Sequence, residues 1–386
     1  MSEYFQKLNT ALQRANFALP TLIIDQERLD QNLAQVKKML TAQAHRRLVV
    51  KSLGSMALIK YIANELNCHH FMVFHLPHIA LILESFPHAD ILFGKPMPIA
   101  AVRTYYEQIQ TGSQKSNAQI QWLIDSKARL EQYLVLAQMM NLRILVNIEI
   151  DIGLHRGGIQ NLAEFKSLLK LIEENPQHLY LSGYMGYDAH VGKIPKMIQS
   201  VAQSYQQSQQ LYQQYITCLK HDFPTLYHAA LCFNGAGSPT FSLHATQSVC
   251  NDLSFGSMLL KPTDFDLPTL EHFQPALWIV APILKKLTTT QIPGLGALNR
   301  LISKEALFVY GGHWMAEYVY PEGAKTNALY GRSSNQELVN IPTSTAIEVD
   351  DFVVLRPTQS EVVINQFEHV YLYHQRTFTP WETFRS

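Results

Sequence analysis

The chain lacks the features that direct proteins to membranes, nucleic acids or an export pathway. Its 386 residues contain no uninterrupted apolar stretch that approaches about 18 residues, so we expect no membrane-spanning helix. Basic and acidic residues number 31 each, so the net charge is zero and nothing favours nucleic acid or an anionic membrane as a partner. Residues 1–7 lack the apolar core of a secretion signal. We therefore expect a soluble, cytoplasmic protein.

Cysteine is scarce, and its spacing excludes the common redox and zinc motifs. The chain has four cysteines, and no two of them form a CxxC pair. In a large cytosolic chain such residues are reduced core thiols, so we expect no disulfides. Apolar residues are plentiful at 47%, which is enough for a large core. The cysteines are Cys68, Cys218, Cys232 and Cys250.

From residue 21 to about residue 265, short β-rich runs alternate with amphipathic helical patterns. Buried strands separated by helices predict a parallel sheet, and eight such units favour a closed (β/α)8 barrel of the TIM type over an open sheet. We therefore expect residues 21–265 to form this α/β barrel. The predicted strands cover residues 48–51, 71–74, 91–93, 120–124, 144–150, 180–184, 228–233 and 248–253.

The pattern changes after residue 265. Strands rich in Val, Ile, Leu and aromatic residues now follow one another, separated by segments with Gly, Pro, Ser and Asn and by no long helical pattern. We expect residues 266–386 to form an all-β domain. The sequence leaves open whether residues 1–20 join it.

The carboxyl ends of the predicted strands carry residue types found in active sites. Lys51 ends the first strand, and its ammonium must extend out of the buried strand. There, partial desolvation and nearby cations favour the neutral amine, which is a nucleophile. The fifth strand is followed by Asp151-Ile-Gly-Leu-His-Arg156-Gly-Gly, a glycine-rich turn that carries an arginine. In a barrel these strand ends converge on one face.

The turns after the last two predicted strands suit a phosphate group. They read Asn234-Gly235-Ala236-Gly237-Ser238 and Gly256-Ser257. Glycine allows backbone N–H groups to close around a phosphate, and the two serine hydroxyls add donors. An amine, a phosphate cradle and an arginine in one pocket suit pyridoxal 5′-phosphate, which binds lysine as a Schiff base.

Each residue taken singly has a simpler interpretation. Lys51 could be an ordinary lysine at a strand end, and Arg156 could pair with Asp151 or Glu149. The glycines before Ser238 could form a plain turn.

Other residues of interest also have structural alternatives. Tyr187 and His190 could pack at the barrel mouth. A group of five residues resembles a metal cluster, but it spans a predicted strand whose side chains alternate between two faces: Cys68, His69, His70, His75 and His78. We expect core or surface histidines there.

Together the motifs resemble those of fold-type III pyridoxal-phosphate enzymes, the alanine racemase superfamily, and within it the D-threonine aldolase and D-serine dehydratase-like branch. The resemblance covers most of the barrel and extends weakly into the β domain. It is carried by Lys51, Glu149-Ile-Asp151-Ile-Gly-Leu-His-Arg156-Gly-Gly, Gly183-Tyr-Met-Gly186-Tyr187-Asp-Ala-His190 and Phe233-Asn-Gly-Ala-Gly-Ser238.

The resemblance implies a role for each matching residue. Lys51 would hold the cofactor as a Schiff base, Arg156 would contact its phenolic oxygen, and Tyr187 and His190 would line the ring or the substrate. We predict Lys51, Tyr187 and His190 as catalytic residues. The predicted cofactor-binding residues are Lys51, Arg156, Tyr187, Asn234, Gly235, Gly237, Ser238, Gly256 and Ser257. The resemblance also implies a homodimer that acts on a small amino acid.

Two stretches depart from the pattern of the superfamily. Alanine racemases carry Arg-Pro-Gly after the last barrel strand, with the arginine facing the pyridine nitrogen, whereas this chain has Ser254-Phe-Gly256. The aldolase and dehydratase branch places two metal ligands after a proline, and here the stretch reads Pro357-Thr-Gln359-Ser-Glu361. An amide is a poor metal ligand, so we assign no metal ligand. A divalent metal bound through Glu361 or through an unmatched residue such as His313 stays open.

We therefore expect a pyridoxal-phosphate enzyme that acts on a D-amino acid. The resemblance favours a lyase, either a D-threonine aldolase that performs retro-aldol cleavage or a D-serine dehydratase. An amino-acid racemase and a non-catalytic carrier or regulator that binds pyridoxal phosphate are the alternatives. The sequence identifies neither the amino acid nor the bond that breaks at its α-carbon.

Overall fold

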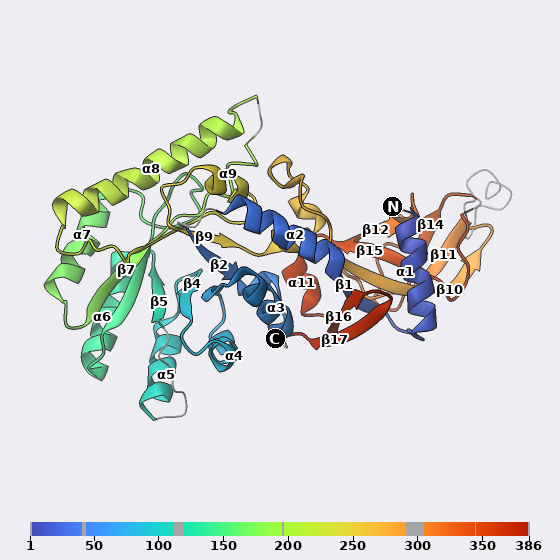
Figure 1. The fold of residues 1–386 in the computed structure, drawn as a ribbon, viewed down its shortest axis with the longest axis horizontal. Helices are drawn as coiled ribbons and strands as arrows, with labels where there is room; N and C mark the ends of the chain where they lie inside the picture. Colours follow the sequence, from blue (N-terminus) through green and yellow to red (C-terminus); the bar gives the residue numbers. More distant parts are fainter. Residues whose placement is uncertain are drawn as a thin grey trace.

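The protein combines a closed barrel of eight parallel strands with a nine-stranded sheet beside it (Figure 1). The computed structural model describes residues 2–40, 44–111, 119–194, 197–290, 305–343 and 345–384. This architecture confirms the predicted TIM-type barrel followed by a β domain. No helix in these ranges is both long and apolar enough to span a bilayer.

The barrel closes where its last strand pairs with its first. Leu48 of the first strand lies opposite Phe255 of the last. In chain order the strands are β2 (His45–Val49), β3 (His70–Val73), β4 (Asp90–Phe93), β5 (Gln119–Ile124), β6 (Ile144–Glu149), β7 (Leu179–Met185), β8 (Cys232–Gly235) and β9 (Asp252–Phe255).

Helices cover the outside of the barrel, and polar caps start several of them. The side chains of Asp25, Ser126 and Asn161 each accept a hydrogen bond from a backbone N–H of the first helical turn, which satisfies a donor that the helix leaves free. The helices are α2 (Gln26–Met39), α3 (Met56–Leu66), α4 (Pro77–Ser85), α5 (Ile99–Gln110), α6 (Lys127–Met140), α7 (Leu162–Glu174), α8 (Val201–Asp222) and α9 (Phe241–Thr246), with short 3-10 turns η1 (Val50–Ser52), η2 (Ser257–Leu259), η3 (Thr263–Phe265) and η4 (Pro268–Leu270).

The last two barrel strands begin four residues later than predicted. The sequence indicated strands over residues 228–233 and 248–253, whereas the structure has β8 over Cys232–Gly235 and β9 over Asp252–Phe255. The prediction was wrong because it treated Asn234 and Ser254 as turn residues. Both side chains are buried and bonded to each other inside the barrel.

The first strand of the chain, β1, belongs to the second sheet. Strand β1 (Thr21–Asp25) pairs antiparallel with β10 (Leu277–Leu287) and parallel with β16 (His369–His374), so it lies outside the barrel although the predicted barrel segment began at residue 21. The boundary at residue 265 stays a prediction. The other strands are β11 (Glu305–Tyr310), β12 (Ala316–Tyr320), β13 (Lys325–Thr326), β14 (Gln336–Ile341), β15 (Phe352–Pro357) and β17 (Thr377–Glu382).

Helix α1 (Ser2–Arg14) packs on this second sheet (Figure 1). The ring of Phe5 lies edge-on to Trp278 with centroids 5.2 Å apart. The side chain of Asn9 donates to the carbonyl of Phe352 at 2.8 Å and accepts from its N–H at 2.6 Å. These contacts attach the start of the chain to the second sheet.

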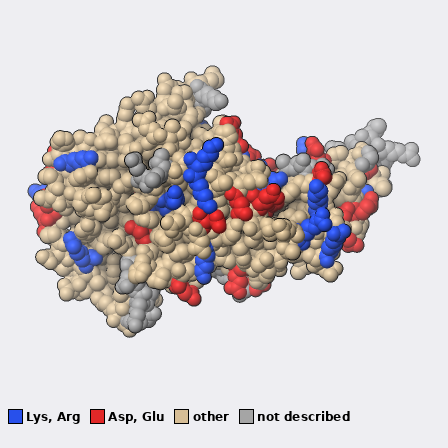
Figure 2. Space-filling model, viewed as in Figure 1, with Lys and Arg blue, Asp and Glu red and all other residues tan. Residues whose placement is uncertain are grey.

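Figure 2 shows acidic and basic side chains interspersed on the face in view, without one large field of a single sign. This distribution agrees with the zero net charge of the sequence. It gives that face no strong electrostatic preference for a charged polymer.

The second sheet reaches the barrel through α11 (Ser360–Ile364) and the C-terminal segment. The hydroxyl of Ser360 donates to the carbonyl of Ser52 at 2.9 Å, and the N–H of Phe384 donates to the carbonyl of Gly54 at 2.7 Å. Gly54 has φ +59°, and a Cβ there would lie 2.5 Å from Cγ2 of Ile364. The turn after β2 is therefore held against α11.

Replacing Gly54 tests how tightly this turn and α11 pack. A Gly54→Ala substitution should cost about 1–2 kcal/mol of unfolding free energy for the left-handed backbone and about 1–3 kcal/mol more for the overlap with Ile364. Gly331→Ala is the matched control, because Gly331 has φ +64° and no atom lies within 4 Å of the place that an added Cβ would take. Urea unfolding measures both variants. Equal losses would contradict the close packing of α11 on Gly54.

Candidate active site

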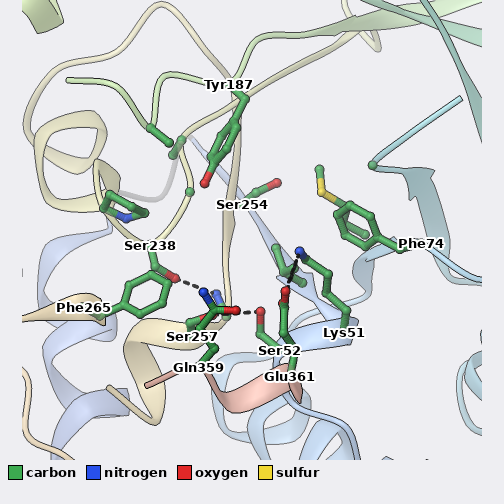
Figure 3. A pocket seen from close by; sticks show the side chains of 18 of the residues that line it. Lys51, Ser52, Phe74, Tyr187, Ser238, Ser254, Ser257, Phe265, Gln359 and Glu361 are labelled. Atoms are coloured by element: carbon green, nitrogen blue, oxygen red, sulfur yellow. Dashed lines mark hydrogen bonds and ion pairs between the residues drawn. The ribbon is translucent and has the colours of Figure 1, made fainter. Parts of the chain in front are cut away.

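A cavity of about 270 Å³ opens at the carboxyl ends of the barrel strands (Figure 3). It is close to the lower end of the range for small-molecule sites, roughly 300–1,000 Å³. The turns after β2, β6, β7, β8 and β9 contribute to its wall, and so does α11 from the second domain. Of the predicted site residues, its lining includes Lys51, Arg156, Tyr187, Asn234, Gly237, Ser238, Gly256 and Ser257.

Lys51 lies in the turn η1 rather than in the strand, because β2 ends at Val49. Its Nζ is 3.2 and 3.1 Å from the two carboxylate oxygens of Glu361 and 4.7 Å from the ring centroid of Phe74. The side chains of Lys51 and Glu361 are 37% and 34% exposed. The amine is thus held between a carboxylate and an aromatic face while it stays accessible from the cavity.

The loop that carries Arg156 is shaped by Asp151. One carboxylate oxygen of Asp151 accepts from the N–H groups of Gly153 and His155, both at 3.0 Å, and the other lies 2.7 Å from His155 Nδ1. Partial burial acts to raise the pKa of Asp151, but these hydrogen bonds hold it below its ordinary value. Asp151 therefore orders the loop through its neighbours.

The Arg156 guanidinium lies over the Tyr187 ring, and both residues line the cavity. Its guanidinium carbon is 5.1 Å from the centroid of the Tyr187 ring, within the range of a cation–π contact. Within the described ranges it forms no salt bridge with Asp151 or Glu149, the two partners that the simpler interpretation suggested. The guanidinium is thus available to an anionic ligand.

Tyr187 rests on the backbone of the loop after β8. A Cβ on Gly237 would lie 2.4 Å from Cε2 of Tyr187, so only glycine allows the ring to approach this closely. Burial raises the pKa of Tyr187, although Arg156 acts to lower it. The neighbouring Asp188 is buried, accepts from Thr240 Oγ1 at 2.6 Å and lies 2.9 Å from His244 Nε2. These bonds fix the Tyr187 turn against the loop that carries Ser238.

Hydroxyl and backbone donors gather where the loops after β8 and β9 meet. Ser238 Oγ accepts from the N–H of Gly256 at 3.3 Å and from that of Met258 at 3.0 Å. The hydroxyl of Ser257 donates to Ser52 Oγ at 2.9 Å. Because Ser238 accepts both bonds, its own proton remains available to an anion in the cavity.

Two predicted site residues lie away from the lining of the cavity. His190 Nε2 is 3.4 Å from Ser208 Oγ, and the ring packs against Gly153. Burial lowers the pKa of His190. Gly235 faces Cys250, whose Sγ would lie 2.4 Å from a Cβ at that position. Gly235 was predicted from the glycine-rich turn and His190 from the family resemblance, and neither sequence spacing nor resemblance distinguishes inward from outward positions.

Other residues that line the cavity were not predicted as part of the site. Ala236, rather than Gly235, lines it, and Ala236 has φ +65°, a conformation that is uncommon for alanine. Ser254 also lines it, although from the sequence it stood out only for the arginine that it replaces. Side chains alternate between the two faces of a strand. A strand correctly placed at residues 252–255 would therefore have indicated that Ser254 faces the barrel interior.

Gln359 and Glu361, the two positions that the resemblance matched to metal ligands, take part in separate pairs here. Gln359 Nε2 donates to Asp264 Oδ2 at 2.8 Å, whereas Glu361 pairs with Lys51. Among the described residues, no three His, Cys, Asp or Glu side chains are close enough to form a metal site. His313 does not line the cavity.

Comparison with known proteins adds a family to this geometry. A sequence model for the family described as "Alanine racemase, N-terminal domain" matches residues 24–263. The sequence matches none of the curated proteins.

Several solved structures are similar to the whole chain. D-threonine aldolase from Filomicrobium marinum has a TM-score of 0.75 at 15% identity, over 95% of each chain. D-threo-3-hydroxyaspartate dehydratase from Delftia sp. HT23 has a TM-score of 0.72 at 15% identity, over 96% of this chain and 98% of the other. Alanine racemase from Bacillus anthracis has a TM-score of 0.70 at 14% identity, over 95% and 98%.

At such identities the similar structures establish the fold and leave the reaction open. The family match is independent of them and spans more than half of the sequence, including all eight barrel strands. The chain therefore belongs to the alanine racemase N-terminal domain family of fold-type III pyridoxal-phosphate enzymes.

Proposed function

We propose that this protein is a pyridoxal-phosphate enzyme that acts on a D-amino acid, with Lys51 as the residue that carries the cofactor. The observation that supports the proposal is the meeting of the Lys51 amine, the Arg156 guanidinium and the Ser238 hydroxyl in one cavity. A cytoplasmic location and a homodimer belong to the same proposal.

The donor set of the cavity fits the cofactor. The phosphate suits the loops after β8 and β9, where the Ser238 hydroxyl keeps its own proton for an anion, while the Gly256 N–H and the Ser257 hydroxyl hold the two loops in place through Ser238 and Ser52. The ring oxygen suits Arg156, which forms no salt bridge in the described ranges and lies against the Tyr187 ring. Tyr187 offers a ring face at the wall. When bound, pyridoxal phosphate supplies an aldehyde for amines and a ring that takes up the electron pair of a bond broken at the α-carbon.

Within that chemistry we assign proton transfer to Lys51 and Glu361. With the cofactor bound and a substrate amine in place of Lys51, the lysine amine would be free to move a proton at the α-carbon. The carboxylate of Glu361 is within hydrogen-bond distance of that amine and is one-third exposed to the cavity. It is placed to accept or return a proton at a β-hydroxyl group. His190 lies away from the lining and has no such role in this proposal.

We propose a lyase that acts on a β-hydroxy D-amino acid, by retro-aldol cleavage or by loss of water. Both reactions need a group that exchanges a proton with the β-hydroxyl. Glu361 meets that need at one of the positions where the related branch has a metal ligand. A racemase needs no such group, because it moves only the α-proton.

Cofactor binding gives the first test. Addition of pyridoxal phosphate to the purified protein should produce an absorbance band near the visible edge, and borohydride should fix the cofactor to the peptide that contains Lys51. Lys51→Ala should lose both signals, whereas Lys193→Ala, a cavity lysine on another loop, should keep the fixed peptide. A wild-type protein that takes up no cofactor would refute the proposal.

Product analysis identifies the reaction. With D-threonine, acetaldehyde and glycine indicate an aldolase, and 2-oxobutanoate indicates a dehydratase; with D-serine, pyruvate indicates a dehydratase. Each of these products would support the lyase. Loss of optical rotation without a new product would indicate a racemase, and no change in any measurement would indicate a carrier.

Glu361→Gln tests the assigned proton transfer. The amide keeps the size of the side chain but accepts no proton, so kcat on the active substrate should fall about 10²- to 10⁴-fold. Cofactor attachment to Lys51 should persist. Glu322→Gln, at an exposed glutamate of the second domain, is the control and should leave kcat unchanged. An unchanged kcat in Glu361→Gln would remove Glu361 from the reaction.

A further inference from the structure

A buried serine lies at the inner end of the cavity. Ser254 is on β9, is 2% exposed, and lines the same cavity as Lys51 (Figure 3). It lies opposite Arg47 in the register of β9 with β2, four residues before Lys51 along that strand and turn. Ser254 is therefore deeper in the barrel than the lysine.

Asn234 fixes the role of the Ser254 hydroxyl. The amide nitrogen of Asn234 donates to Asp252 Oδ1 at 2.6 Å and to Ser254 Oγ at 2.8 Å. An ionised carboxylate only accepts hydrogen bonds, so the amide must present its NH₂ group to Asp252. The second hydrogen has two acceptors within reach, Ser254 Oγ at 2.8 Å and the Asp252 carbonyl at 3.3 Å, and the shorter contact assigns it to Ser254. The serine oxygen is an acceptor in this bond, and its own proton must point elsewhere.

A buried ion pair holds Asn234 in this orientation. Arg47 Nε and Nη2 donate to the two oxygens of Asp252 at 2.7 and 2.8 Å. Arg47 is 0% exposed, and Asp252 and Asn234 are 1% exposed. Breaking this ion pair would leave a buried, unpaired charge, which is costly. Asp252 therefore keeps its place and continues to accept the hydrogen bond from the Asn234 amide.

The free proton of Ser254 is directed to the cavity. Among the described residues, no side chain or carbonyl accepts a hydrogen bond from Ser254, although its hydroxyl lines the cavity wall. A buried hydroxyl that lacks an acceptor costs free energy, so the site favours a ligand that brings an acceptor atom to this point.

The ring nitrogen of pyridoxal phosphate is the neutral acceptor that suits the Ser254 hydroxyl. The phosphate and ring oxygen of the cofactor are anionic and suit the loop donors and Arg156. Its ring nitrogen is opposite the ring carbon that bears the aldehyde, so it points away from Lys51 and into the barrel. We propose that Ser254 donates a hydrogen bond to the ring nitrogen and that Asn234, Asp252 and Arg47 are positioning residues for that bond. This inference rests on the proposed function.

The proposal has a chemical consequence. A serine hydroxyl donates a hydrogen bond but is far too weak an acid to transfer its proton to a pyridine. The ring nitrogen therefore stays unprotonated. An unprotonated ring is a weaker electron acceptor than a pyridinium ring, so this protein relies more on Lys51 and Glu361 to manage protons at the substrate.

The test is ¹⁵N NMR of the holoenzyme loaded with pyridoxal phosphate labelled at the ring nitrogen. The wild type should give the high-frequency resonance of an unprotonated pyridine that accepts a hydrogen bond. Ser254→Ala should move it to still higher frequency and weaken cofactor binding about two- to twelve-fold, the equivalent of one hydrogen bond. Ser254→Thr should restore both values. Ser254→Asp should shift the resonance to low frequency, because a carboxylate stabilises pyridinium.

Ser182→Ala is the matched control. Ser182 is also a buried strand serine of the barrel, but its hydroxyl donates to the carbonyl of Val146 at 2.9 Å and lies outside the cavity lining. It should leave the resonance unchanged. Asn234→Ala removes the amide that orients the Ser254 hydroxyl, so this hydroxyl is then free to rotate. The resonance should move part of the way toward that of Ser254→Ala.

Two results would overturn the inference and leave the proposed function intact. One is a low-frequency, protonated resonance in the wild type, a measurement that needs no variant to fold. The other is a resonance in Ser254→Ala that matches that of Ser182→Ala. Failure of the wild type to take up the cofactor would instead refute the proposed function, and this inference with it.

Discussion

The ion pair between Arg47 and Asp252 is the interaction on which the barrel and its site depend. Both charges are buried at the seam where β9 closes onto β2. Burial favours the neutral carboxyl, but Arg47 holds the pKa of Asp252 well below its ordinary value, so the pair stays ionised. Arg47 also lies 2.8 Å from Asp90, which accepts from Gln121. The barrel interior is therefore polar at this level, and hydrogen bonds orient Asp90, Gln121 and Asp252. That order extends to the inner end of the cavity through Asn234.

The cavity combines a rigid barrel with a wall supplied by the second domain. The barrel provides Lys51, Arg156 and the loops with hydroxyl and backbone donors, which are the parts that resemble the family. Helix α11 and the residue before it provide Glu361 and Gln359, which are the parts that depart from the related branch. Under the proposed function, attachment of the cofactor and choice of reaction are assigned to two different regions of the chain. On that proposal, substitutions in α11 would change the chemistry while leaving the barrel strands in place.

Much of the fold and part of the site were predictable from local patterns. Alternation of strands and helices indicated eight barrel strands, and Lys51, Arg156 and Ser238 reach one cavity because parallel strands end on the same side. The positions of β8 and β9 were missed because Asn234 and Ser254 are polar, and polar residues bonded inside a barrel have the composition of a turn. The place of β1 was missed because its partners in β10 and β16 are distant in sequence. The wall position of Glu361 is likewise a tertiary contact that no local pattern records.

The pairing of β1 has a consequence for the synthesis of the protein. This strand is synthesised well before its neighbours β10 and β16, which begin at residues 277 and 369. At about 5–20 residues per second, a nascent chain exposes this apolar strand for on the order of tens of seconds. All five of its residues are buried in the finished protein. During translation the barrel strands are complete before β1 has partners, so the nascent chain carries an unpaired strand edge until β10 has been synthesised.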